Sequence, residues 1–145
     1  EVFSGTIAEN LHLERPEIGV HELRDTLRQF GLLEQFLELP DGLDTELNAT
    51  GYPLTPTQLR KLILARATVG RPSLLLIDGL LDSLPDDELD SVLRLLTDPE
   101  RPWTLLVATG REAIASRMTK RVELPDAPPP SLHGSPATNG NGHVH

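Results

Sequence analysis

Aspartates that follow a short apolar run near the middle of the chain are the residues whose type and spacing most directly suggest chemistry. Asp78 ends the run Leu74 to Ile77, and Asp82, Asp86 and Asp87 follow it closely. A carboxylate at the C-terminal end of a strand can hold Mg²⁺, usually through water. One hypothesis is therefore a divalent-metal phosphotransfer or binding module on a doubly wound fold.

Helix formation offers a second explanation for two of these aspartates. Asp86, Asp87 and Glu88 place negative charge in the first turn of a predicted helix, where it favours the positive end of the helix dipole. The apolar residues that follow recur at helical spacing and predict its buried face: Leu89, Val92, Leu93 and Leu96. This explanation makes the metal module the least favoured hypothesis.

A second candidate site is the segment from Leu54 to Gln58. Thr55 is followed by Pro56 and, three residues on, by Gln58, which matches a capping box with proline at the first helical position. Backbone N–H groups at a helix N-terminus can bind phosphate. We predict a helix that begins after Thr55 and ends before Gly70.

Further helices and turns are predicted ahead of this segment. Apolar residues between Val20 and Leu37 recur at three- and four-residue steps, which predicts an amphipathic helix with a break near Gly31. Turn residues follow at 39–42, and the stretch 43–52 has no clear period. We predict a loop there.

The second half of the chain predicts a parallel sheet. The run Leu74 to Ile77 and the run Thr104 to Ala108 are typical of strands buried on both faces, and the helix between them predicts a right-handed crossover. A short helix at 112–118 and a last strand at 121–124 would complete an α/β layer.

Composition narrows the class of partner and site. The chain has 145 residues and a net charge of -9, which disfavours nucleic acid as a partner. No apolar run reaches the roughly 18 residues needed to cross a bilayer, so direct membrane insertion is not expected. The absence of cysteine excludes disulfides, thiolate metal sites and a cysteine nucleophile. From Pro125 to His145 the sequence is rich in Pro, Gly, Asn and His and predicts a disordered tail with no site.

Several segments, taken in order, resemble the nucleotide-binding domains of ABC exporters. Phe3 to Asn10 matches the family's FSGTIxEN segment, and Leu39 to Thr45 matches LPxGLDT. Leu62 to Ala67 matches LxLARA, and Leu74 to Asp78 matches the Walker B strand. Each match alone is weak, but their order and spacing are hard to obtain by chance. The resemblance covers the chain up to about Leu124.

The resemblance implies the C-terminal half of such a domain. Its fold is α/β, a partial P-loop NTPase-like (ABC ATPase) domain with a helical and signature subdomain at 1–70 and a parallel sheet with the Walker B and switch region at 71–124. The remaining residues, 125–145, form the tail. No GxxxxGK[ST] motif occurs in the chain, so the Walker A half is absent from it and is expected upstream of residue 1.

The resemblance also assigns positions at the site. Residues Leu54 to Gln58 stand where the family has its LSGGQ signature loop, so Thr55, Thr57 and Gln58 are the candidate nucleotide contacts. Pro56 removes one N–H donor from that loop. Asp78 stands at the Walker B aspartate, which holds Mg²⁺ through water.

Other family positions are replaced. Gly79 stands where the family has its catalytic glutamate, and Gly110 stands where it has its switch histidine, so no catalytic residue is assigned. The stretch Asp82 to Pro85 replaces the SALD motif of the D-loop. Arg111 either lies near the phosphate end of the site or is an ordinary surface residue. These losses imply a degenerate domain that is inactive by itself.

The resemblance leaves two functions to weigh against the metal module. The first is a degenerate domain that couples or regulates an ATP-driven membrane transporter on the cytoplasmic side of the membrane. Its partners would be an ABC transmembrane domain and a second nucleotide-binding domain, identical or different. Mg-ATP is the family's ligand, but this chain is not expected to hold it tightly. The second is part of a full-length domain that binds and hydrolyses ATP to power export.

Overall fold

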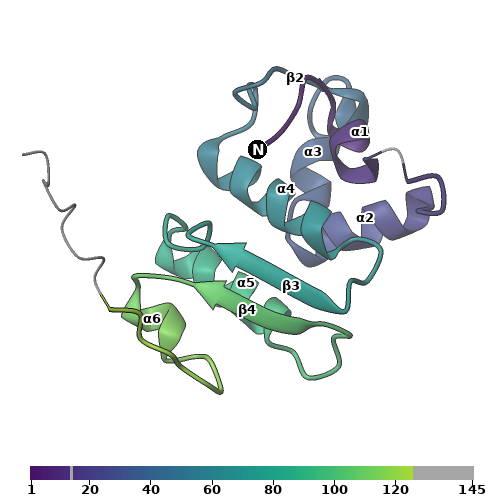
Figure 1. Ribbon diagram of the computed structural model, residues 1–145. Helices are drawn as coiled ribbons and strands as arrows, with labels where there is room; N and C mark the ends of the chain where they lie inside the picture. Colours follow the sequence, from purple (N-terminus) through teal and green to yellow (C-terminus); the bar gives the residue numbers. More distant parts are fainter. Residues whose placement is uncertain (14, 126–145) are drawn as a thin grey trace, which may run out of the picture.

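Helices dominate the first half of the chain, and a strand–helix–strand unit follows them (Figure 1). The computed structural model describes residues 1–13 and 15–125. The elements are, in chain order, β1 (Gly5–Thr6), α1 (Ile7–His12), α2 (Val20–Gln29), α3 (Leu33–Leu37), the short 3-10 helix η1 (Gly42–Asp44), β2 (Glu46–Leu47), α4 (Pro56–Thr68), β3 (Leu74–Asp78), α5 (Asp86–Leu96), β4 (Thr104–Ala108) and α6 (Glu112–Ala115). We call residues 1–13 and 15–70 the helical part and residues 71–124 the sheet part.

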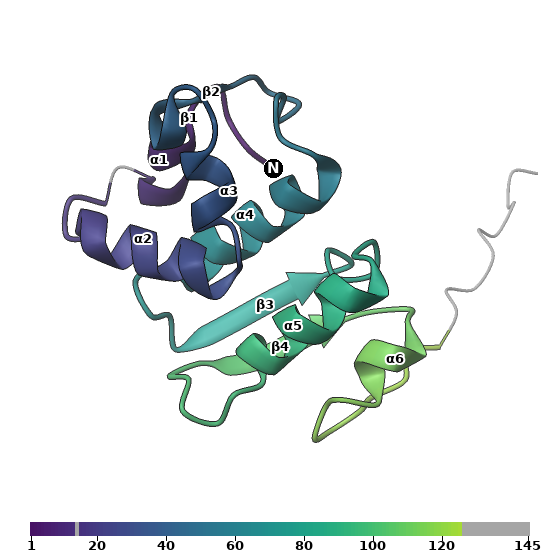
Figure 2. The same ribbon diagram turned by 180° about the vertical axis from the view of Figure 1, so that it is seen from behind.

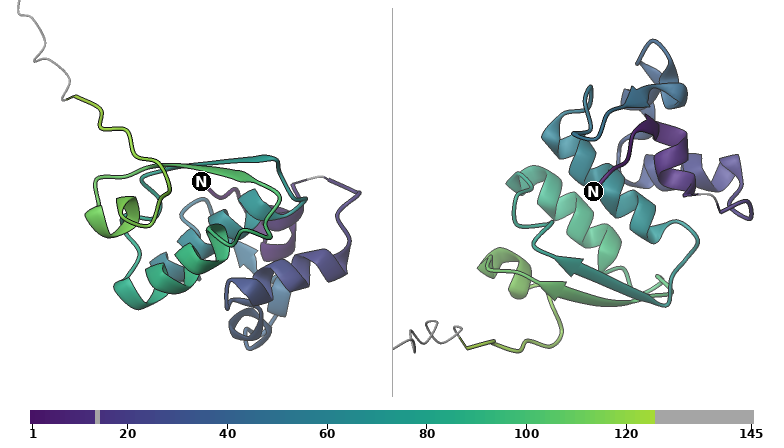
Figure 3. Two further views of the ribbon diagram at one scale, coloured as in Figure 1. Left: turned by 90° about the horizontal axis from the view of Figure 1, so that it is seen from below. Right: turned by 45° about the horizontal axis from the view of Figure 1, so that its top comes forward.

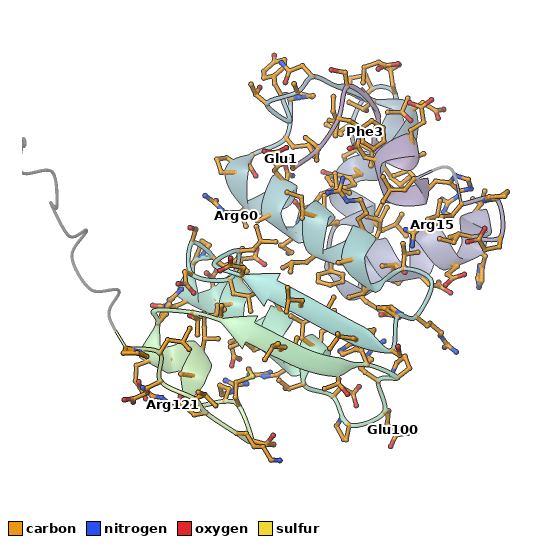
Figure 4. All side chains as sticks on the ribbon, in the orientation of Figure 1. Glu1, Phe3, Arg15, Arg60, Glu100 and Arg121 are labelled. Carbon is orange, nitrogen blue, oxygen red and sulfur yellow. The ribbon has the colours of Figure 1, made fainter. Side chains whose placement is uncertain are left out.

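Helix boundaries in the helical part follow local signals. The predicted break at Gly31 separates α2 from α3, and its φ of 65° lies in the left-handed region that glycine adopts most readily. The guanidinium of Arg15 donates to the carbonyls of Leu11 and Val69, both at 3.2 Å, and so joins the ends of α1 and α4 (Figure 4). Helix α2 packs against α1, α3 and α4, so the helices of this part form one packed unit.

The predicted loop at 43–52 is wrong in part. The structure forms η1 there and then β2, which pairs antiparallel with β1 in the register Gly5↔Leu47 and Thr6↔Glu46. Strands of two residues are too short to show a periodic pattern, and their partner lies far away in the sequence. Such pairing is therefore invisible to a local analysis of the sequence.

Strands β3 and β4 pair in parallel, as predicted, in a register that runs from Leu74↔Thr104 to Asp78↔Ala108. The prediction that both faces are buried is wrong. Leu75 is buried, whereas Leu74 and Leu76 are 58% and 66% exposed. Helix α5 and the helical part lie on the same side of the strand pair (Figures 2 and 3), which leaves the other face without cover from the described residues.

Helix α5 buries the face predicted for it, and the segments after β4 differ from prediction. Helix α6 ends at Ala115 rather than near Met118. Residues 121–124 form no strand, because they have no neighbouring strand to pair with among the described residues. Val122 and Leu124 are each 84% exposed.

A continuous apolar core runs through both parts, and aliphatic side chains dominate it, as the low aromatic content predicts. The chain passes from one part to the other through Gly70 and Arg71, which both have positive φ. No helix among residues 1–13 and 15–125 is long and apolar enough to cross a membrane. Apart from Pro125, the predicted tail lies outside the described residues.

Candidate functional site

The N-terminus of α4 and the N-terminus of α5 face one polar hollow of about 240 Å³. Its lining combines residues from α3, α4 and the turn into α5: Gln35, Thr55, Thr57, Gln58, Lys61, Pro85, Asp87 and Glu88. All three candidate residues of the signature loop, Thr55, Thr57 and Gln58, therefore line the hollow. Asp78, Gly79 and Gly110 do not line it.

Signature-loop candidates at the start of α4 bond to each other. The hydroxyl of Thr55 accepts from the backbone N–H of Gln58 at 3.2 Å, and the side-chain carbonyl of Gln58 accepts from the backbone N–H of Thr55 at 2.9 Å. This is the predicted capping box. The side-chain amide of Gln58 also donates to Gln35 at 2.8 Å. Since Pro56 has no N–H, the backbone N–H of Thr57 is the donor at residues 55–58 that the described residues leave unbonded.

Asp78 lies at the C-terminal end of β3, where the sequence predicts it, and its side chain is exposed. Among the described residues its carboxylate has no hydrogen-bond partner, so it is available to a cation. No group of three or more His, Asp or Glu side chains in the described part of the chain is placed to hold a metal ion. The structure therefore gives no support to a metal module built from Asp78, Asp82, Asp86 and Asp87.

Gly79 follows Asp78 with a φ of +65°, in the left-handed region. A Cβ built there would meet nothing within 4 Å. A larger side chain therefore has room but would hold its backbone in a conformation that costs roughly 1–2 kcal/mol for an L-residue. The glycine at position 79 is evident from the sequence, whereas its left-handed conformation appears only in the structure.

Asp82 ties the turn after β3 to the loop after β4. Its carboxylate accepts from the hydroxyl of Thr109 and, at 3.0 Å, from the backbone N–H of Gly110. The hydroxyl of Thr109 in turn accepts from the backbone N–H of Arg111 at 3.0 Å. The polar groups of the loop that contains Gly110 are thus bonded inside the chain.

Arg111 completes this tie, and we call Asp82, Thr109, Gly110, Arg111 and Asp86 the loop clamp. The Arg111 guanidinium donates to the carbonyl of Leu84 at 2.8 Å and pairs with the carboxylate of Asp86. Its side chain is 26% exposed, so Arg111 is neither a free phosphate contact nor a loose surface residue. Sequence reasoning missed the clamp because its partners come from separate segments.

A further carboxylate on α5 is engaged by arginines. Arg117 donates to Asp90 at 2.8 Å, and Arg94 pairs with the same carboxylate. The hydrogen bond from Arg117, helped by the positive charges of both arginines, holds the pKa of Asp90 below its ordinary value of 3.8. These contacts hold the segment after α6 against α5.

A parallel strand pair with a crossover helix, in which β3 ends in Asp78, together with a separate helical part, is an arrangement of the α/β class to which nucleotide-binding domains belong. No protein-family profile matches the chain. It is 34% identical over 95 residues, 66% of its length, to "Uncharacterized ABC transporter ATP-binding protein YfiB" of Bacillus subtilis. It is 30% identical over 110 residues, 76% of its length, to "Cyclolysin secretion/processing ATP-binding protein CyaB" of Bordetella pertussis.

A third relative is similar over the same share of the chain. The chain is 34% identical over 110 residues to "Glutathione/L-cysteine transport system ATP-binding/permease protein CydC" of Escherichia coli. The chain belongs to the ATP-binding domains of ABC transporters of the exporter type. The matches span only 16%, 15% and 19% of the three relatives.

A solved structure supports the fold independently. A bacterial Atm1-family ABC exporter with ATP bound matches 79% of this chain and 20% of its own, with a TM-score of 0.71 and 22% identity. This confirms the predicted α/β class, with a helical part beside a partial parallel sheet.

Proposed function

We propose that residues 1–124 are the C-terminal part of an ABC exporter nucleotide-binding domain that has lost its own grip on nucleotide. The observation that carries the proposal is internal bonding at the positions expected to contact phosphate. The groups of Thr55 and Gln58 cap α4, and the backbone N–H of Gly110 bonds to Asp82. Gly79 has no side chain to orient water.

Mg-ATP fits these residues poorly. A phosphate cradle needs several convergent backbone N–H groups and a lysine. Here the segment around Thr57 offers a single unbonded N–H, and Asp78 offers a single free carboxylate. The Mg²⁺ role assigned to Asp78 therefore requires phosphate oxygens held by another chain segment.

In this proposal the domain acts as a coupling or regulatory partner. It docks on a transmembrane domain at the cytoplasmic side of the membrane and faces a second nucleotide-binding domain. The uncovered sheet face supports the idea that more of the domain packs here, because Leu74, Leu76 and Leu106 are each more than half exposed.

A second candidate function is slow ATP hydrolysis by the longer protein. One observation favours it: Asp78 lies at the end of β3, and its carboxylate has no hydrogen-bond partner among the described residues. A P-loop lysine in the longer protein would then supply the missing cradle.

Phosphate release by the longer protein distinguishes the two functions. We expect no turnover above a blank, and no change when Asp78→Asn is introduced. Loss of a general base or water-positioning group costs on the order of 10²- to 10⁴-fold in rate. Turnover that depends on Asp78 would support the second function and would contradict the first.

A further inference from the structure

A part-buried ion pair joins the two parts of the molecule. The Nζ atom of Lys61, on α4, lies 2.7 Å from Oε2 of Glu88, on α5. Only 6% of the Lys61 side chain is exposed, against 31% of the Glu88 side chain. Neither residue stands at a nucleotide-contact position described above, so the pair needs an explanation of its own.

Few polar contacts connect the helical part to the sheet part. Within residues 1–13 and 15–125, Lys61–Glu88 is the ion pair that bridges them. The other side-chain hydrogen bond between the parts runs from Arg101 to Gln29, at 3.0 Å, near the far end of α5. Otherwise the parts meet through apolar contacts and the connecting chain at Gly70 and Arg71.

Two hollows adjoin the pair. One is the hollow of about 240 Å³ at the start of α4, and the other has a volume of about 360 Å³. Lys61 and Glu88 line both, together with Gln35. The pair therefore lies at the seam, the boundary between the helical part and the sheet part, between two hollows that both reach this boundary.

Such an ion pair can select one orientation of two parts while it adds little to the free energy of unfolding. The cost of removing the Lys61 charge and part of the Glu88 charge from water offsets much of their attraction, so the pair adds little net stability. Apolar contacts are not directional and permit several orientations of two bodies. An ion pair with one geometry selects among those orientations.

We propose that Lys61 and Glu88 are positioning residues that set the orientation of α4 against α5, and with it the orientation of the helical part on the sheet part. The orientation set by this ion pair also sets how the residues that line the hollow, among them Thr55, Thr57 and Gln58, are placed. It goes beyond the proposed function, because it holds whether or not the domain binds nucleotide.

The test measures distances between spin labels in the 145-residue chain, which has no cysteine of its own. Cysteines at Arg24, on α2, and Thr104, on β4, report across the seam. Cysteines at Arg24 and Glu34, both in the helical part, provide the control. All three side chains are exposed.

Three variants distinguish an ion pair that sets orientation from one that only stabilises the fold. Lys61→Met breaks the pair, and Lys61→Met with Glu88→Leu replaces it by apolar groups, which leaves no unpaired charge in case the single variant fails to fold. Lys61→Glu with Glu88→Lys reverses the charges. We expect the unmodified pair to give one narrow distance peak across the seam.

The first two variants should lose that peak, and the charge reversal should restore it, while the Arg24–Glu34 distance stays the same throughout. An unchanged seam distance in the folded apolar double variant would overturn the proposal, because the pair would then set no orientation. Equal broadening at the control distance would also overturn it, because general loosening would explain the result.

Discussion

The start of α4 and the end of β3 are the two nucleotide-facing regions expected from the family, and they differ in how their polar groups are used. At the start of α4 the groups of Thr55 and Gln58 bond to each other. At the end of β3 the Asp78 carboxylate is exposed and bonds to none of the described residues. In the proposed function, the loop at the start of α4 therefore serves as a helix cap, while the carboxylate of Asp78 stays free of the described residues. The comparison teaches that a residue can keep its place in the fold, as Asp78 does, independently of whether the polar groups of a neighbouring loop remain free to bind a ligand.

The largest expected effect breaks the loop clamp. Asp82→Ala removes the acceptor for both the Thr109 hydroxyl and the Gly110 N–H. The Thr109 hydroxyl is part-buried, and a polar group left unsatisfied there costs about 1–3 kcal/mol, so the free energy of unfolding should fall by that amount, whereas the Gly110 N–H is exposed and can bond to water. Urea unfolding followed by circular dichroism measures it. A loss no larger than that of Asp78→Asn would show that the clamp contributes nothing.

A somewhat smaller effect is expected at Gly79. Gly79→Ala forces an L-residue into a φ of +65°, although the added methyl group has open space around it. We expect a loss of about 1 kcal/mol in unfolding free energy. Gly110→Ala is the matched control, because its φ is ordinary and its Cβ would meet only Asp82 Oδ2 at 3.9 Å. Equal costs at the two positions would argue against backbone strain at Gly79.

Substitution of Thr55, at the start of α4, should lower the free energy of unfolding more than substitution of Asp78, at the end of β3. Thr55→Ala removes a helix cap and should cost about 1 kcal/mol. Asp78→Asn changes an exposed, unbonded side chain and should stay within about 0.5 kcal/mol of the parent. The same urea titrations compare them, and a reversed order would mean that Asp78 has a partner and Thr55 does not cap.

The smallest effect concerns an engaged carboxylate and appears in the pH dependence. The Arg117 hydrogen bond lowers the pKa of Asp90, so its contribution to stability is present above its ordinary value of 3.8 and is lost as the pH falls through the lowered pKa. The difference in thermal midpoint between the parent and Asp90→Asn should therefore shrink below pH 3.8. A difference that grows in acid would contradict this sign, and Asp78→Asn serves as the control.

Local signals allowed much of the fold to be predicted. The capping box at Thr55, the break at Gly31 and the buried face of α5 all depend on residues close together in the sequence. The β1–β2 pair and the exposed face of β3 depend on distant segments or on the absence of a covering layer. Neither leaves a periodic trace.

The candidate site divides in the same way. The resemblance predicted which family positions Thr55, Asp78, Gly79 and Gly110 occupy. Their bonding was not predicted, because Asp82 meets Gly110 only through the fold. The Lys61–Glu88 pair is hidden for the same reason: its partners lie on different helices in different parts of the molecule.

Calorimetric titration of the chain with Mg-ATP tests the central claim most directly, with Asp78→Asn titrated alongside it. If the polar groups of Thr55, Gln58 and Gly110 are held in hydrogen bonds within the chain, neither protein should give heat beyond dilution. Saturable binding by the parent that disappears in Asp78→Asn would show that the start of α4 and the end of β3 still act together on nucleotide, and would contradict the account.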